Sequence, residues 1–204
     1  EGEEMRVNEE GFKGGDRTSI ELPKAQRETL AMLHKAGKKV IFVNCSGSAM
    51  ALVPELESCD AILQAWYGGE LGGQALAEVL FGQYNPSGKL PITFYKNTDE
   101  LPDFLDYTMK NRTYRYYTGE ALFPFGYGLS YTTFEIGKPV YQNNKVLVSV
   151  KNTGKKAGLE TVQVYLRNLK DPNGPLKSLR AYQQIQLNPG ESKTLSIDLP
   201  RQSF

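Results

Sequence analysis

The chain has 204 residues, enough for one large domain or two ordinary ones, each able to bury a core of its own. Its 24 Lys and Arg residues nearly balance its 23 Asp and Glu residues, so no cationic excess predicts a nucleic-acid partner. The mean hydropathy is -0.44 and no apolar run approaches the roughly 20 residues of a membrane-spanning helix, so we expect a globular protein without a membrane partner.

The chain opens with four residues that read EGEE, without an initiator Met or a signal peptide. We therefore expect it to be a piece of a longer protein whose targeting signals lie upstream. Taken alone, an acidic run of this kind is most often a solvated surface. The alternative is general acid chemistry, because a carboxylic acid with a raised pKa can protonate a leaving oxygen near neutral pH. The residues by themselves leave both interpretations open.

The first half of the chain alternates helical and strand signals. Residues 24–35 are predicted to form a helix, because Pro23 suits its start and Gly37 suits its end. A continuous apolar run at 40–43 is typical of a buried strand in a parallel sheet, and 61–66 is predicted to be the next buried strand. This order of helices and strands predicts an open, mostly parallel α/β sheet.

A glycine-rich loop at 68–73 follows the second strand and leads into a predicted helix at 75–81. The loop lacks the G-x-G-x-x-G order of a dinucleotide site, and the chain contains no P-loop. Such a loop can seat an anion at a helix N-terminus, but a tight turn with a close approach of strand and helix is the more frequent reason for its glycines.

Side chains suited to nucleophilic or metal chemistry are few. The two cysteines, Cys45 and Cys59, are too few for a disulfide scaffold, and the single His34 excludes a multi-histidine metal cluster. Cys45 has no nearby basic residue to stabilise a thiolate, and His34 falls near the end of the predicted helix without a partner. We interpret both as structural.

The middle of the chain loses its periodicity. Residues 85–88 predict a turn, and 90–94 predict a strand whose Pro91 favours an edge or a first position. The segment 97–134 then carries six of the 12 tyrosines. These rings either stack on sugars or pack a long connector between two domains, and both interpretations fit the sequence equally well.

From residue 141 onward, apolar and polar residues alternate as in half-buried strands, with turns at 152–154 and 188–190. Strands separated by such turns predict an antiparallel sandwich. The pattern predicts about five strands where such a sandwich usually has roughly seven. We therefore expect the chain to stop inside this domain.

Several motifs occur together in a fixed order. They are EGEEM at 1–5, GGDRT at 14–18, LP at 22–23, YGGELGGQA at 67–75, NPSGKLPITF at 85–94 and FPFGYGLSYT at 123–132. In this order they resemble the C-terminal part of glycoside hydrolase family 3, which contains β-glucosidases and β-xylosidases. The resemblance extends over essentially the whole chain.

The resemblance implies a specific architecture. Members of the family place a (β/α)8 barrel before an α/β sandwich, bind the sugar between the two, and continue into a fibronectin type III-like domain. No part of this chain matches the barrel. The expected domains are an α/β sandwich at 1–96, a Tyr-rich connector at 97–134 and a fibronectin type III-like domain at 135–204.

The resemblance also implies a retaining, exo-acting hydrolase that removes terminal β-linked xylose or glucose with two carboxylates. The family's nucleophile is an Asp on the barrel, and its acid/base Glu lies in the loop that opens the α/β sandwich. We expect Glu3 to be this acid/base, because it follows Gly2 as the family's Glu commonly follows a small residue. Glu1 is the second choice. No metal or organic cofactor is implied.

The expected partners are an oligosaccharide or aryl glycoside and the barrel of the same protein. Without the barrel, we expect the chain alone to hydrolyse nothing measurable. The opening acidic motif favours xylose, and a periplasmic or secreted location is expected from the resemblance. Two alternatives remain: a non-catalytic carbohydrate-binding or scaffold module, and a phosphate-binding or small-ligand α/β domain that uses the loop at 68–73.

Overall fold

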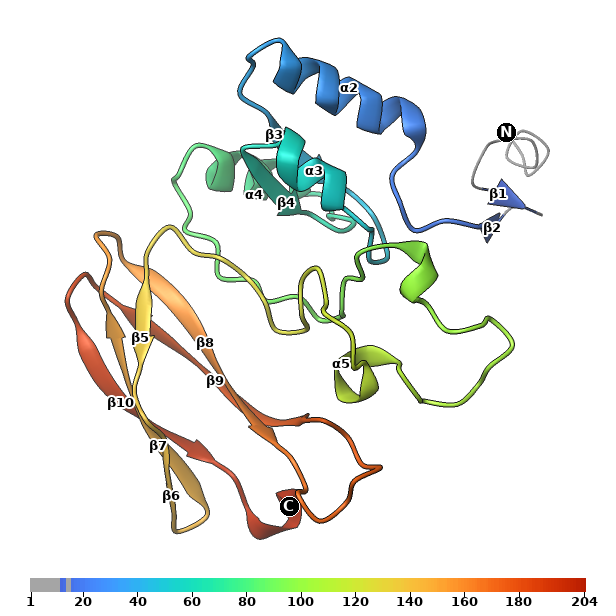
Figure 1. Cartoon of the computed structure of the whole chain (residues 1–204). Coiled ribbons are helices and arrows are strands. Elements are labelled where there is room, and N and C mark those ends of the chain that lie inside the picture. The colour runs from blue at the N-terminus through green and yellow to red at the C-terminus, as the bar shows by residue number, and fades with distance from the viewer. Residues whose placement is uncertain (1–11, 14–15) are drawn as a thin grey trace. The chain divides into compact units, whose positions relative to one another are not determined.

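The computed structural model describes residues 12–13 and 16–204, which form two compact units (Figure 1). Each unit is assembled from several stretches of the chain. The first contains the described residues up to Gly72 together with Ile92–Asn111 and Thr118–Pro124. The second contains Gly73–Pro91, Arg112–Tyr117 and Phe125–Phe204. No helix in the described part of the chain is both long and apolar enough to cross a membrane.

The first unit contains a parallel pair of strands with helices between and beside them. Its elements are β1 (Phe12–Lys13), β2 (Asp16–Arg17), α2 (Lys24–Lys35), β3 (Ile41–Asn44), α3 (Val53–Ser58), β4 (Ala61–Gln64) and the 3-10 helix η1 (Thr98–Glu100). β3 and β4 pair in parallel, and β1 pairs with β2 in an antiparallel hairpin. The predicted fold class is confirmed, since the parallel pair precedes antiparallel sheets.

Local sequence signals fix the ends of α2. The Pro23 carbonyl accepts hydrogen bonds from the backbone N–H groups of Gln26 and Arg27, at 2.9 and 3.2 Å. Gly37 ends the helix with a φ of +70°, in the left-handed region that glycine adopts without strain. The helix therefore covers the predicted residues 24–35.

The core of the first unit is small. Leu22, Met50 and Leu52 are buried, and partly buried apolar side chains pack against them: Leu30, Phe42, Ile62 and Leu122. Leu30 comes from α2, whereas Phe42 and Ile62 come from β3 and β4. The apolar runs that predicted strands thus supply one face of the core.

The strand predicted at 90–94 is wrong. Only Phe94 forms a β-bridge, with Phe123, and the remaining residues of the stretch are irregular. Leu90 instead exchanges two backbone hydrogen bonds of 2.8 Å with Gly126 and Tyr127. Pro91 has no N–H to donate, so a continuous ladder cannot run through it.

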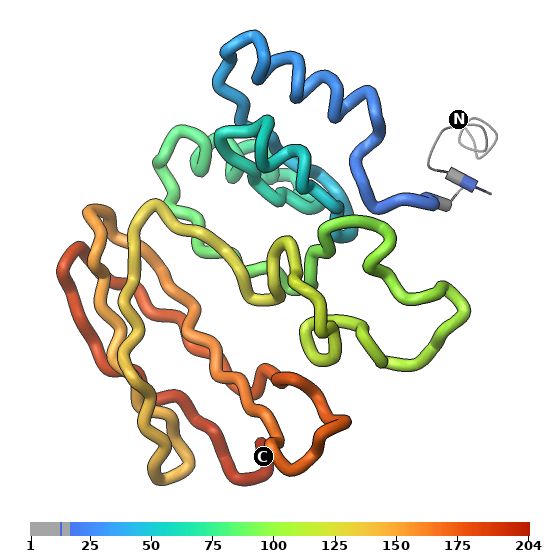
Figure 2. Tube along the Cα trace, viewed as in Figure 1, coloured from blue at the N-terminus to red at the C-terminus, as the bar shows by residue number. Residues whose placement is uncertain are grey.

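The second unit is built around an antiparallel sandwich, whose strands can be followed along the trace in Figure 2. Its elements are most of α4 (Gly72–Leu80), α5 (Thr113–Tyr116), β5 (Phe134–Ile136), β6 (Val140–Gln142), β7 (Lys145–Asn152), β8 (Gly158–Leu166), β9 (Ser178–Leu187), β10 (Ser192–Asp198) and the 3-10 helix η2 (Arg201–Ser203). One sheet has the order β10-β7-β5, with β6 also pairing with β7, and the other pairs β8 with β9. β5 precedes the first strand that the sequence pattern predicts.

Alternating side chains of the two sheets form the core of the second unit. The buried members are Val146, Val148, Val150, Val162, Ile185, Leu187, Leu195, Ile197 and Leu199. Each such side chain contributes about 1.5–3 kcal/mol when it is removed from water. The two-residue alternation that predicted these strands therefore reflects the inward face of the sandwich.

One polar side chain lies within this apolar surrounding. Asn152, the last residue of β7, is 0% exposed. Its Oδ1 accepts hydrogen bonds from the Thr132 hydroxyl at 2.7 Å and the Gly154 N–H at 3.0 Å. Its Nδ2 donates to the carbonyls of Lys156 and Leu187, at 2.8 and 3.1 Å. The amide thus fixes the turn between β7 and β8 to the end of β9.

We expect Asn152→Ala to lower the free energy of unfolding of the chain by about 2–3 kcal/mol, because it leaves buried donors and acceptors unpaired. Asn173→Ala, at an exposed position, is the control and should change it by less than about 0.5 kcal/mol. Urea titration followed by circular dichroism measures both. Equal stabilities of the two variants would contradict the role assigned to the Asn152 amide.

Candidate active site

The two sequence-predicted catalytic residues, Glu3 and Glu1, lie outside the described residues. The described chain that follows them is the hairpin of β1 and β2, which ends at Arg17. The surroundings of Arg17 show where this hairpin contacts the rest of the first unit. They lie at the carboxyl ends of β3 and β4, where open α/β sheets bind their ligands.

Polar side chains close the carboxyl end of the parallel strand pair. Asn44 and Gln64 are opposite each other in the ladder, and the Asn44 Nδ2 donates to the Gln64 Oε1 at 2.7 Å. Asn44 Nδ2 also donates to the Ser46 hydroxyl at 3.1 Å, and that hydroxyl donates to the Ser48 carbonyl at 2.8 Å. Because Asn44 is buried, these bonds satisfy its amide and hold the loop after β3 in one shape.

Arg17 joins the hairpin to this same loop. Its Nη2 donates to the Ser48 hydroxyl at 2.5 Å, and its Nη1 lies 2.6 Å from the Met50 Sδ. Met50 belongs to the buried core of the first unit. The guanidinium thus attaches β2 to a rigid part of the sheet edge.

Aromatic side chains follow the end of β4. Trp66 has a φ of +54°, a strained conformation for a bulky residue, and its ring meets Phe94 edge-on at a centroid distance of 6.2 Å. Tyr67 is 78% exposed and its ring lies over Gly47, where a Cβ would come within 2.7 Å of the Tyr67 Cε2. A side chain at position 47 would therefore displace the exposed Tyr67 ring.

The glycine loop after β4 has the geometry of a close approach. A Cβ on Gly68 would lie 2.9 Å from the Gly72 Cα at the start of α4, and the Gly72 N–H donates to the Gly69 carbonyl at 2.9 Å. These contacts support the interpretation of the loop as a tight turn between strand and helix.

Glu21 is a carboxylate stabilised in its charged form. Burial would raise its pKa, but hydrogen bonds from Ser19 and Thr98 outweigh that effect and lower the pKa from 4.5 to about 2. The Thr98 N–H and hydroxyl donate to the two carboxylate oxygens at 2.9 and 2.6 Å. Glu21 thus ties η1 to the segment before α2 and cannot serve as an acid near neutral pH.

Glu55, in contrast to Glu21, is a buried carboxyl group whose pKa is raised. It is 1% exposed on α3, and neither carboxylate oxygen has a hydrogen-bond partner among the described residues. Burial raises the pKa of Glu55 above its usual 4.5, and the charge of Arg27 on α2 offsets only part of this effect. A buried carboxylate is a hallmark of functional sites, but Glu55 lies on the helix that packs against α2. Nothing in the sequence of α3 distinguishes Glu55 from the neighbouring Glu57.

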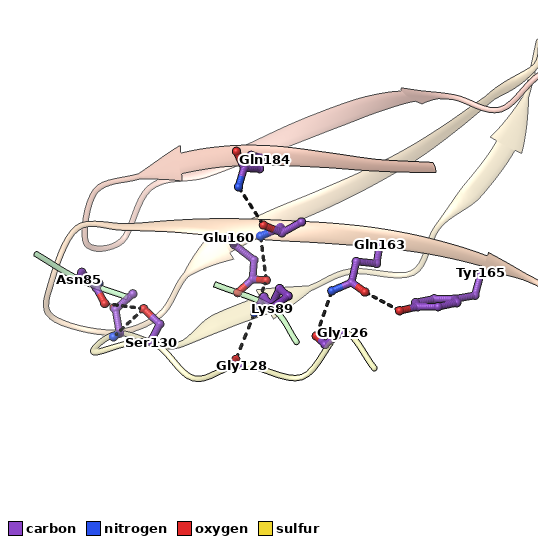
Figure 3. A network of polar contacts seen from close by, with 11 residues as sticks. Asn85, Lys89, Gly126, Gly128, Ser130, Glu160, Gln163, Tyr165 and Gln184 are labelled. Carbon is purple, nitrogen blue, oxygen red and sulfur yellow. Dashed lines mark hydrogen bonds and ion pairs between the residues drawn. The ribbon is translucent and has the colours of Figure 1, made fainter. Parts of the chain in front are cut away.

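The long motifs at 85–94 and 123–132 make structural contacts in the second unit (Figure 3). The Lys89 ammonium pairs with the Glu160 carboxylate of β8 at 2.9 Å and donates to the Gly128 carbonyl at 3.2 Å. The Lys89 and Glu160 side chains are only 19% and 12% exposed. The pair therefore fastens both motifs to β8.

Asn85 and Gly126 make further hydrogen bonds with β8 and with the residue that precedes it. The Asn85 Oδ1 accepts from the Ser130 hydroxyl at 2.9 Å, and its Nδ2 donates to the Ala157 carbonyl at 2.9 Å. The Gln163 Nε2 donates to the Gly126 carbonyl at 3.0 Å. Gly126 has a φ of +82°, so the motif needs glycine there for backbone reasons as well.

Several rings of the Tyr-rich segment pack within the protein. Tyr114 stacks on Phe125 at a centroid distance of 4.2 Å, and both meet Tyr165 of β8 edge-on. The Tyr114 hydroxyl accepts a hydrogen bond from the Leu179 N–H at 3.1 Å. Tyr107, in contrast, is 87% exposed. For Tyr114, the connector interpretation is the one that these contacts support.

Comparison with known proteins identifies the class of the chain. The model of the glycosyl hydrolase family 3 C-terminal domain matches residues 1–131, and that of the fibronectin type III-like domain matches residues 160–204. The chain belongs to glycosyl hydrolase family 3, as the C-terminal part of its members. The resemblance found in the motifs is thereby confirmed.

Relatives match the chain nearly end to end. A xylan 1,4-beta-xylosidase of Xylanibacter ruminicola is 61% identical over 100% of the chain, which covers 24% of that protein. A periplasmic beta-glucosidase of Salmonella typhimurium is 39% identical over 92% of the chain, which covers 27% of it. The chain thus spans about a quarter of the length of these relatives.

Solved structures share the fold. A beta-glucosidase from Kluyveromyces marxianus matches 94% of the chain with a TM-score of 0.81 and 38% identity, over 25% of its own length. Beta-glucosidase 3B from Thermotoga neapolitana, in complex with glucose, matches 96% of the chain with a TM-score of 0.83 and 32% identity, over 30% of its own length. Both agree with an α/β sheet followed by an antiparallel sandwich.

The unpaired carboxylate of Glu55 leads to a stability prediction. Because its folded-state pKa lies above its unfolded value, its favourable contribution is present below about pH 4.5 and is lost as the pH rises through the folded pKa. We expect Glu55→Met to raise the free energy of unfolding at pH 7 by about 1–2 kcal/mol and to weaken the dependence of stability on pH. Thermal melts between pH 4 and pH 8 measure both effects. Glu57→Met, on the exposed side of α3, is the control, and an equal gain there would refute this account.

Proposed function

We propose that the chain is the C-terminal part of a retaining, exo-acting β-glycosidase that removes terminal β-linked xylose or glucose from oligosaccharides. The observation that carries this proposal is the 61% identity, over the whole chain, to a xylan 1,4-beta-xylosidase. That similarity and the acidic opening motif favour xylose. The periplasmic beta-glucosidase of Salmonella typhimurium supports a periplasmic or secreted location.

In this proposal Glu3 is the general acid/base, with Glu1 as the second choice. A retaining mechanism needs two carboxyl groups about 5–5.5 Å apart, one to attack the anomeric carbon and one to protonate the leaving oxygen. The family resemblance assigns the nucleophile to an Asp of the barrel, which this chain does not match. The chain therefore supplies the proton and one wall of the pocket.

The contacts of Arg17 suggest how the chain after Glu3 is held, whichever glutamate is the acid. A general acid is effective only when it is held against the substrate, because misplacement by about 1 Å can cost 100-fold in rate. The chain that follows Glu3 reaches Arg17, whose guanidinium bonds to Ser48 and approaches Met50. We assign Arg17 a positioning role for the segment that carries the acid.

Glu3 can be tested in a chimaera in which this chain replaces the aligned quarter of the Xylanibacter ruminicola enzyme. We expect Glu3→Gln to lower kcat/KM for an aryl β-xyloside with a poor leaving group by about 10²–10⁴-fold. An aryl xyloside with a strongly acidic phenol needs little protonation and should lose much less. Glu1→Gln is the matched control, and the chain alone should show no turnover. If Glu3→Gln keeps full activity and Glu1→Gln loses kcat/KM, Glu1 is the general acid and the assignment of Glu3 is wrong.

Arg17→Ala in the same chimaera should lower kcat/KM more for the poor leaving group than for the acidic phenol. The reason is that kcat/KM reports the first step, in which a displaced general acid matters mainly where the leaving oxygen needs protonation. Arg17→Lys, which keeps the charge but not the two-armed geometry, should recover only part of the rate. Kinetics over a series of aryl xylosides measure the difference. A loss of the same size for every leaving group would show that Arg17 contributes stability alone.

A further inference from the structure

An open groove lies along the sandwich where β9 and β10 meet. β9 pairs with β8 and β10 pairs with β7, so the groove follows the junction of the two sheets. It has a volume of about 600 Å³. The lining residues from β9 are Leu179, Arg180, Ala181, Tyr182 and Gln183, and those from β10 are Ser196, Ile197 and Asp198.

The groove is apolar on its inner side and polar on its outer side. Ile197 is buried, and Ala181 packs against the core of the sandwich. Arg180, Gln183 and Ser196 are exposed, and Tyr182 is 67% exposed. A surface that combines an aromatic ring with planar hydrogen-bonding groups matches a sugar ring, which has apolar faces and a rim of hydroxyl groups.

A β-bulge places Arg180 at this groove. Leu179 pairs with Tyr165 and Ala181 pairs with Val164, so Arg180 is an extra residue in the ladder between β8 and β9. A bulge of this kind bends the strand and redirects a side chain. It also makes the edge of the sheet less able to pair with another strand. The geometry therefore favours a ligand that binds through side chains over a peptide that extends the sheet.

The polar groups on the outer side are available for a ligand. Within the described part of the chain, the side chains of Arg180, Tyr182 and Gln183 have no hydrogen bond or ion pair. Arg180 brings five N–H donors and Gln183 brings two donors and an acceptor. The Asp198 carboxylate is 3.2 Å from the Lys145 ammonium, so the groove carries no excess of positive charge to attract a nucleic acid.

We infer that this groove binds a β-linked polysaccharide chain of the xylan type. Tyr182 stacks on one sugar ring, while Arg180 donates hydrogen bonds to hydroxyl oxygens or to the carboxylate of an acidic side group. The choice of a xylan rests on the proposed function, since the groove would hold the polymer whose free ends the enzyme removes. Binding itself does not need the catalytic carboxylates.

Affinity electrophoresis of the 204-residue chain in gels with neutral xylan, uronate-substituted xylan or mixed-linkage β-glucan tests this site. We expect xylan to retard the wild-type chain, and Tyr182→Ala and Arg180→Ala each to weaken the association at least about tenfold. Preference of the wild type for uronate-substituted xylan, lost in Arg180→Ala, would assign the guanidinium to the acidic group. Gln186→Ala, exposed on β9 but outside the groove, is the control and should bind as the wild type does.

Unchanged retardation of both groove variants, or no retardation of the wild type by any of the glycans, would overturn the inference. Thermal melts check that the variants are folded. In the chimaera, the groove variants should raise KM for polymeric xylan and leave the aryl xyloside unaffected. If the chain binds xylan but the chimaera is inactive, the proposed hydrolysis is refuted and the binding site in the groove is supported. If the chimaera is active but xylan does not retard the chain, the binding site is refuted and the proposed hydrolysis is supported.

Discussion

The hydrogen bond between Asn44 and Gln64 is the constraint on which the candidate active site depends. It joins the last residues of two parallel strands, and the same Asn44 amide holds Ser46 in the loop that follows. That loop provides Ser48 and Met50, to which Arg17 attaches the start of the described chain. A buried amide with its partners in place costs little, whereas an unpaired one costs about 1–3 kcal/mol. The contact of Arg17 with this loop therefore depends on the hydrogen bonds between the polar side chains at the strand ends.

A second set of polar contacts explains the structural role of the long motifs at 85–94 and 123–132. The partly buried pair of Lys89 and Glu160 joins residues 85–91 to β8, and Gly128 contributes its carbonyl to the same ammonium. Ion pairs at exposed positions contribute little, but one that is largely removed from water is expensive to break, because the remaining charge then lacks a partner. These parts of the motifs that identify the family thus have a structural role within the second unit.

The sequence predicted the elements whose signals are local. Pro23 and Gly37 bound α2, and the alternation of valines located β7. The prediction of a strand at 90–94 failed because that stretch makes only isolated backbone hydrogen bonds, with Gly126, Tyr127 and Phe123. Pro91 has no N–H and prevents a continuous ladder. The burial of Glu55 and the bulge at Arg180 were not predictable, since they depend on packing between α2 and α3 and on the register of β8 against β9. For Glu3, only the family resemblance carries the assignment.

The two proposed sites belong to different units of the chain and use different chemistry. The candidate active site needs fixed geometry, and near it the described residues provide the buried Asn44 amide and the Arg17 guanidinium, which contacts the core residue Met50. The proposed binding in the groove between β9 and β10 uses side chains that are free to contact a ligand, and the Arg180 side chain has no partner within the described part of the chain. An exo-acting enzyme that releases a chain end after each cut gains from a second, weaker contact with the polymer, because tethering raises the local concentration of ends without slowing release of the product. Low affinity in the groove is thus what this division of roles requires.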